Sequence, residues 1–189
     1  MVRLARAVDT AQLSPERRDD ALRARWGAGP DTPIAIHVGR IAPEKNLALA
    51  VRAFRAIGRQ RPDARFVWVG DGPARDALAR ENPDFIFCGV QRGEALARHF
   101  ASGDLFLFPS LSETFGNVTI EAMACGVPVV SSDAGALPDV VRGAGIVVPA
   151  ARAGSTTACQ AYRTLGRQPK CGQCVQFARS IIDEERAAA

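Results

Sequence analysis

From Thr32 onward, short apolar runs alternate with segments whose apolar residues recur at helical spacing. A short apolar run bounded by glycine or proline is typical of a buried strand, and helical spacing is typical of an amphipathic helix. The pattern predicts six strands, at 34–38, 65–69, 85–87, 104–108, 128–131 and 146–148. It predicts helices between them, from 47 to about 61 and at 74–81, 93–101, 118–125 and 137–142.

Strands that alternate with helices in this way form a parallel sheet covered on both faces. We therefore expect an α/β fold, a doubly wound, six-stranded Rossmann-like sheet. In the usual strand order, 3-2-1-4-5-6, the first and fourth strands are neighbours, and ligands bind at their carboxyl ends. This order predicts that the chemistry lies in two loops, Gly39–Asn46 and Pro109–Asn117.

The chain is divided into three parts by its composition. Residues 1–30 are polar and arginine-rich and are interpreted as a linker remnant, residues 31–150 as the Rossmann-like domain, and residues 151–189 as a short helical tail with cysteines. Hydrophobic residues make up 47% of the chain, which is enough for a full core, and the net charge is only +4. No basic run is interleaved with aromatics, so no nucleic acid is expected as a partner. The absence of an apolar leader or span and the reducing-type cysteine usage predict a cytoplasmic protein.

The two loops carry residues suited to a diphosphate. Gly39 allows a tight turn and close ligand approach, Arg40 offers a bidentate fork, and Lys45 a point charge. Gly116 and Asn117 precede a predicted helix, whose first amides and positive dipole end attract anions. The chain contains no Asp-x-Asp sequence to hold a divalent metal. The loops therefore predict a diphosphate site with no metal and no cofactor.

Two motifs make the resemblance to a known family specific. Gly39-Arg-x-x-x-Glu-Lys-Asn46 is followed about seventy residues later by Glu113-x-Phe-Gly-x-x-x-x-Glu121-Ala-Met-Ala-x-Gly-x-Pro-Val-Val130. Over residues 8–149 the chain resembles the donor-binding half of family-4 glycosyltransferases of GT-B fold. The resemblance implies a retaining, metal-independent glycosyltransferase, here the hexosyltransferase type. The variant Glu-Thr-Phe-Gly-Asn-Val-Thr at 113–119 is similar to mannosyl- and sulfoquinovosyl-type members.

The resemblance also implies a role for each matching residue. Arg40 and Lys45 would hold the donor diphosphate and stabilise the departing nucleotide, and Glu113 would contact the donor sugar. The other predicted contacts are Phe115, Gly116 and Asn117 along the sugar and diphosphate, Glu121 on the ribose hydroxyls, and Val90 beside the base. Independently of the family, the buried strand position of His37 favours a core histidine over a ligand.

A complete GT-B enzyme has an N-terminal domain that binds the acceptor, and the sequence matches only the other half. The resemblance therefore implies a nucleotide-diphosphate sugar donor as one partner. The second partner would be a sugar or lipid acceptor, reached through the missing domain, with peripheral membrane association of the full enzyme. Without that domain, we expect the chain to bind the donor and not to transfer the sugar.

The tail supports a different hypothesis. Cys171-Gly-Gln-Cys174 resembles the C-terminal half of bacterioferritin-associated ferredoxin, a [2Fe-2S] protein. Such a cluster takes four cysteine thiolates, and the ferredoxin's first Cys-x-Cys pair is absent from this chain, where Cys159 is the remaining tail cysteine. The sequence leaves three alternatives: a glycosyltransferase domain, a non-catalytic nucleotide-sugar-binding protein and an iron–sulfur module, in a truncated, fused or misassembled chain.

Overall fold

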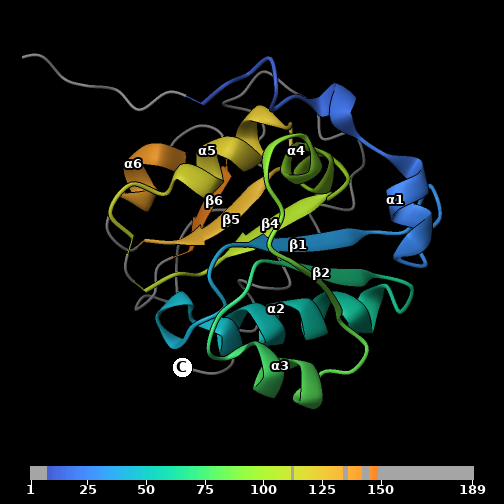
Figure 1. The fold of residues 1–189 in the computed structure, drawn as a ribbon. Coiled ribbons are helices and arrows are strands. Elements are labelled where there is room, and N and C mark those ends of the chain that lie inside the picture. Colours follow the sequence, from blue (N-terminus) through green and yellow to red (C-terminus); the bar gives the residue numbers. More distant parts are fainter. Residues whose placement is uncertain (1–7, 112, 134–135, 142–144, 149–189) are drawn as a thin grey trace, which may run out of the picture.

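The computed structural model describes residues 8–111, 113–133, 136–141 and 145–148 (Figure 1). The helices are α1 (Asp20–Arg25), α2 (Leu47–Gln60), α3 (Arg75–Glu81), α4 (Gly93–Ala101), α5 (Asn117–Ala124) and α6 (Leu137–Val141), with 3₁₀ turns η1 (Pro15–Arg17) and η2 (Pro43–Lys45). The strands are β1 (Ile34–Val38), β2 (Arg65–Val69), β3 (Ile86–Gly89), β4 (Leu105–Phe108), β5 (Val129–Ser132) and β6 (Gly145–Val148). The predicted helical tail lies outside the described residues.

The strands form one parallel sheet in the order β3-β2-β1-β4-β5-β6. Every residue of β1, β4 and β5 is buried, as expected where helices cover both faces of a sheet. β1 pairs with β4 through Ala35 opposite Leu105 and Ile36 opposite Phe106. The predicted parallel α/β fold is confirmed, and so is the predicted adjacency of the first and fourth strands.

Two helical layers enclose the sheet. Figure 1 shows α4, α5 and α6 over one face and α2 and α3 over the other. Side chains of a strand alternate between faces, so Ile34, Ile36 and Val38 join one apolar cluster and Ala35 joins the other. The second cluster is rich in aromatic rings, and in it Phe66 and Phe85 contact each other and both Phe54 and Trp68.

The segment before β1 is packed into the domain. Leu13, Leu22 and Trp26 are buried in the same cluster as the α4 residues Ala97 and Phe100. The interpretation of residues 1–30 as a linker remnant did not anticipate this packing. Arginine-rich segments are usually solvated, so composition alone favoured a surface segment.

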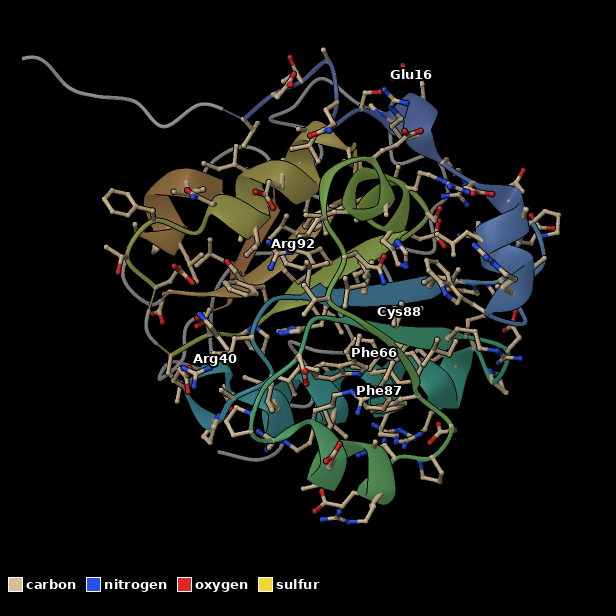
Figure 2. The ribbon with its side chains drawn as sticks, in the orientation of Figure 1. Glu16, Arg40, Phe66, Phe87, Cys88 and Arg92 are labelled. Atoms are coloured by element: carbon tan, nitrogen blue, oxygen red, sulfur yellow. The ribbon has the colours of Figure 1, made fainter. Side chains whose placement is uncertain are left out.

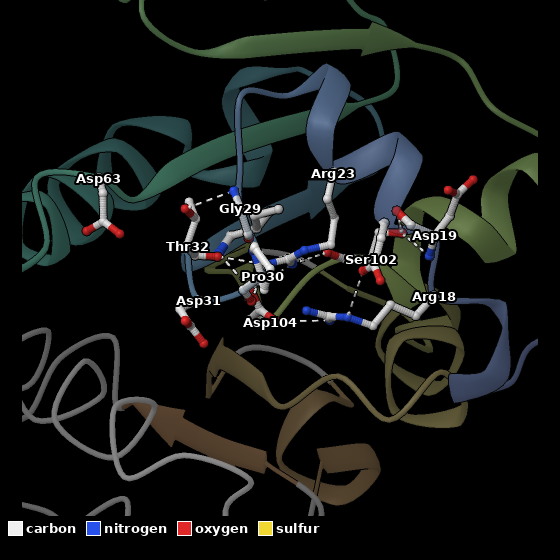
Figure 3. A network of polar contacts seen from close by, with 12 residues as sticks. Arg18, Asp19, Arg23, Gly29, Pro30, Asp31, Thr32, Asp63, Ser102 and Asp104 are labelled. Atoms are coloured by element: carbon white, nitrogen blue, oxygen red, sulfur yellow. Dashed lines mark hydrogen bonds and ion pairs between the residues drawn. The ribbon is translucent and has the colours of Figure 1, made fainter.

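Arg23 on α1 ties this segment to the beginnings of β1 and β4 (Figure 3). Its side chain is 2% exposed and donates to the Ser102 carbonyl at 2.8 Å, to Asp104 Oδ2 at 3.0 Å and to the Thr32 carbonyl at 2.7 Å. Asp104 Oδ2 also accepts the amide of Ile34 at 2.9 Å. One carboxylate therefore connects α1, the first residue of β1 and the residue before β4.

The third strand is displaced from its predicted position. The sequence predicts 85–87, whereas β3 runs from Ile86 to Gly89 and pairs with β2 through Gly89. Phe85 is buried, but its amide bonds to the Asn82 carbonyl in the preceding turn. The apolar pattern reports burial of side chains and not ladder hydrogen bonds, which explains the shift.

Candidate functional site

The two loops singled out by the strand order meet at the carboxyl ends of β1 and β4. The amide of Leu111, after β4, donates to the carbonyl of Glu44, after β1, at 3.0 Å. The side chains of Lys45 and Glu113 join across the same loops. The predicted meeting of these loops is confirmed, although the role of each residue remains a prediction.

Lys45 and Glu113 form the centre of the site. Lys45 Nζ lies 3.0 Å from Glu113 Oε2, with the two side chains 16% and 19% exposed. Lys45 Nζ also lies 5.3 Å from the centre of the Phe108 ring, within the range of a cation–π contact. The largest effect on Glu113, burial, would raise its pKa, but the Lys45 hydrogen bond and the amides of Gly116 and Phe115 lower the pKa below its ordinary value. Glu113 is therefore ionised at neutral pH.

The backbone around Lys45 fixes its position. Lys45 ends the turn η2, and Asn46 follows with φ 52°, a left-handed conformation uncommon for a residue other than glycine. Asn46 is also the residue before α2. The left-handed Asn46 therefore lies between Lys45 and the first residue of α2.

Arg40 lies closer to solvent than Lys45. Its side chain, which is labelled in Figure 2, is 66% exposed. It forms an ion pair with Glu44, four positions further along, at 3.5 Å. Gly39, before it, has φ +146°, and a side chain there would meet Phe108 at 3.8 Å. Arg40 therefore belongs to the same loop as Lys45, and its ion pair with Glu44 is formed within that loop.

The amino end of α5 faces this cluster. Gly116 precedes the helix with φ +65°, and its carbonyl accepts from Thr119 Oγ1 at 2.5 Å. The amides of Gly116 and Phe115 donate to Glu113. Among the described residues, buried Oδ1 of Asn117 has no hydrogen-bond partner. Phe115 is 49% exposed, and its ring lies at the surface.

Glu121 and Val90 are the predicted contacts that lie outside the loops after β1 and β4. Glu121 is one turn into α5 and half-buried, and burial raises its pKa above the ordinary value for a glutamate. Val90 follows β3, is 58% exposed and is separated from the β1 loop by β2. The structure thus brings Lys45, Glu113 and the start of α5 together, and Val90 follows a strand that is separated from β1 by β2.

The structure confirms that His37 is a core histidine, and it shows a contact of Glu44 that the sequence did not indicate. His37 Nδ1 donates to the Leu107 carbonyl at 2.9 Å, while Nε2 has no partner among the described residues. Burial lowers the pKa of His37 to about 4, so the ring is neutral at physiological pH and packs on Trp68. Glu44, the partner of Arg40, was seen only as part of a motif. Within the described residues, no group of three or more His, Cys, Asp or Glu side chains could hold a metal ion.

In the described part of the chain, no helix is both long enough and apolar enough to cross a membrane. Cys171 and Cys174, on which the alternative iron–sulfur hypothesis rests, lie outside the described residues, as does Cys159.

The chain is similar to known proteins in both sequence and fold. A sequence model described as Glycosyl transferases group 1 matches residues 32–164. The sulfoquinovosyl transferase SQD2 of Arabidopsis thaliana is 39% identical over 139 residues, which are 72% of this chain and 26% of that protein. A GDP-mannose-dependent alpha-mannosyltransferase of Mycolicibacterium smegmatis is 45% identical over 141 residues, which are 74% of this chain and 36% of that protein.

Among solved structures, Anabaena HepE in complex with UDP and glucose matches with a TM-score of 0.66. The match has 23% sequence identity and covers 96% of this chain and 50% of that chain. At this identity the likeness concerns the fold alone, one half of a GT-B protein. The chain thus spans only a minor part of the length of the two curated relatives.

Proposed function

Because the chain belongs to the group 1 glycosyl transferases, we propose that its domain binds a nucleotide-diphosphate sugar as the donor half of a retaining, metal-independent enzyme. The observation that carries this proposal is the pairing of Lys45 with Glu113 at the carboxyl ends of β1 and β4, beside the start of α5. At the carboxyl ends of these two strands, a cation, a carboxylate and the amino end of a helix come together. This combination suits an anion linked to a hydroxyl-rich group.

The negatively charged diphosphate would lie on the β1 side of the site. Lys45 and Arg40 would neutralise the diphosphate, and the first amides of α5 would approach it with the positive end of the helix dipole. As the bond from the anomeric carbon to the diphosphate oxygen breaks, charge grows on that oxygen. Fixed cations stabilise such growing charge more than they stabilise the bound donor, which lowers the barrier.

Glu113 and Glu121 would recognise the sugars. Glu113, ionised and held by Lys45, offers a carboxylate that accepts hydrogen bonds from donor-sugar hydroxyls. Glu121 would accept both ribose hydroxyls. In the transfer, the acceptor oxygen would bond to the anomeric carbon on the face that the diphosphate leaves, and the acceptor proton would pass to the departing diphosphate.

The names of the relatives narrow the donors worth testing. One relative is named for GDP-mannose and another for sulfoquinovosyl transfer, and the motif at 113–119 resembles those same two types. Anabaena HepE is described with UDP and glucose. We therefore propose a guanosine or uridine diphosphate sugar as the donor. The acceptor, membrane association and cytoplasmic location remain predictions for the full enzyme.

The test is a calorimetric titration of the chain with GDP, UDP, guanosine and uridine. We expect one diphosphate to bind and its nucleoside to bind more weakly. Replacing Lys45 or Arg40 by alanine removes a charge-assisted contact of about 1.5–3 kcal/mol, so diphosphate affinity should fall about tenfold or more. Nucleoside affinity should stay unchanged. Equal losses for both ligands would contradict the assignment, as would a chain that binds neither diphosphate.

A further inference from the structure

We propose that Gly70 and Gly72, in the loop after β2, are positioning residues for Arg40. Because glycine has no side chain, the loop after β2 can approach Gly39 and Ile41, on either side of Arg40, and bond to their main chain. The proposal rests on the proposed function, because it concerns how the diphosphate-binding arginine is held in place.

Backbone hydrogen bonds bracket Arg40 on both sides. The amide of Gly39 donates to the Val69 carbonyl at 2.9 Å, and the amide of Ile41 donates to the Asp71 carbonyl at 2.9 Å. The Ile41 carbonyl accepts the amide of Ala74 at 3.1 Å. The residue before Arg40 is therefore bonded to the end of β2, and the residue after Arg40 to the loop that follows β2.

The two loops are too close for any side chain at positions 70 and 72. A Cβ atom at Gly70, where φ is +135°, would lie 1.9 Å from the Gly39 carbonyl oxygen. A Cβ atom at Gly72 would lie 2.3 Å from the Ile41 carbonyl oxygen and 2.9 Å from its amide nitrogen. The atoms in the way belong to the main chain, which cannot rotate aside as a flexible side chain does. An alanine at either position must therefore displace the segment that contains Arg40.

Arg40 depends on this support because its own side chain is poorly fixed. The guanidinium is 66% exposed, whereas Ile41 and Ala42 are fully buried. The buried neighbours and the bracketing bonds set where the Arg40 Cα lies, and from there the side chain reaches solvent. A small shift of this backbone would misplace the charge relative to a diphosphate, and misplacement by about 1 Å can cost a binding or catalytic group about a hundredfold.

The experiment compares Gly70→Ala and Gly72→Ala with the unmodified chain by titration with GDP and UDP. We expect diphosphate affinity to fall about tenfold, as for loss of one charge-assisted contact, with nucleoside affinity unchanged. The decisive step repeats each substitution in the Arg40→Ala background, where the loss should disappear because there is no guanidinium left to misplace. A structural defect unrelated to Arg40 would cause the same loss in both backgrounds.

Gly27→Ala is the matched control. Gly27 also has a left-handed φ, +68°, but a Cβ atom there would meet the Arg65 side chain at an ordinary 3.7 Å. This variant carries a backbone penalty of the same kind at the opposite end of the sheet, and its diphosphate affinity should equal that of the unmodified chain. Should the Gly70 and Gly72 variants fail to fold, Asp71→Ala replaces them. Asp71 Oδ1 accepts the Gly72 amide at 2.8 Å, and its removal loosens the loop without adding an atom.

For Asp71→Ala we expect a loss of about threefold, because the bond from the Gly72 amide to this carboxylate is exposed to solvent and contributes little, again absent in the Arg40→Ala background. Persistence of any of these losses without Arg40, or no loss at all, would overturn the positioning role. If the unmodified chain binds neither diphosphate, the proposed function fails instead. The positioning claim is then decided by amide hydrogen exchange, which should accelerate at Ile41 in Gly72→Ala and not in Gly27→Ala; unchanged exchange would overturn it.

Discussion

At the scale of single residues, the site has a balanced charge. Lys45 is paired with Glu113, which is 68 positions away in sequence, and Arg40 is paired with Glu44. Each cation proposed to bind the diphosphate therefore already has a carboxylate neighbour. The carboxylates repel the ligand's phosphates, so the net attraction of the site is smaller than two cations alone would give.

This balance predicts that Glu113→Gln raises the affinity for a nucleoside diphosphate. The substitution keeps the shape and an acceptor oxygen for Lys45, but it removes one negative charge close to the ligand. A unit charge about 5 Å away at an effective dielectric constant near 20 is worth a few kcal/mol before screening, so a gain of about three- to tenfold is expected. The measurement is a titration of GDP and UDP at low salt.

Two comparisons make this result specific. Glu44→Gln removes the charge beside the exposed Arg40, where solvent screens it, and should raise the diphosphate affinity less. The affinity gain of Glu113→Gln should shrink as salt is added. A diphosphate affinity that falls in Glu113→Gln at every salt concentration would show that the carboxylate mainly orients Lys45, contrary to this prediction.

At the scale of elements, α1 belongs to the domain core and is fastened by one buried arginine. Arg23 bonds to carbonyls and a carboxylate that precede β1 and β4, while Leu22 and Trp26 supply apolar contacts. A buried arginine without partners would be very costly, so its position depends on all of these acceptors. If the arginine is removed, these acceptors in turn lose their hydrogen-bond donor.

Arg23→Met is therefore expected to lower the free energy of unfolding by about 2–4 kcal/mol. Methionine fills much of the same space, so the loss reports hydrogen bonds more than packing. Arg25→Met is the matched control, since Arg25 lies on the same helix and is exposed, and it should change stability by less than about 0.5 kcal/mol. Urea denaturation measures both variants. Equal stability of the two variants would show that the Arg23 bonds contribute nothing net.

The contrast between α1 and the sheet shows which elements a sequence can predict. The apolar runs of β1 and β4 end at glycine or proline, so local pattern was enough for the strands and for the loops where the site lies. The burial of Arg23 depends on Asp104, 81 positions away, and no local pattern contains that partner. The contact of the Gly70–Gly72 loop with Gly39 and Ile41 was missed for the same reason, because the glycines signal a turn but not what packs against it.

At the scale of the whole molecule, the described domain corresponds to one part of its relatives. The aligned segments make up 26% and 36% of two curated relatives, and 50% of the HepE chain matched by structure. The proposed donor binding would depend on groups that this domain itself holds. Transfer also needs an acceptor hydroxyl held against the anomeric carbon and the exclusion of water, and we propose that the remaining part of the enzyme supplies both.

The last prediction is that the 189-residue chain binds a nucleotide sugar and does not transfer the sugar. Holding two reactants in register can supply about 7–11 kcal/mol of barrier reduction, and the domain alone holds only one of them. The assay combines GDP-mannose or UDP-glucose with sugar and lipid acceptors, beside a titration of the same donors. Binding without turnover is the expected result. Turnover that disappears in Lys45→Ala would belong to this chain and would contradict the prediction, whereas turnover that persists in Lys45→Ala would point to a contaminating enzyme.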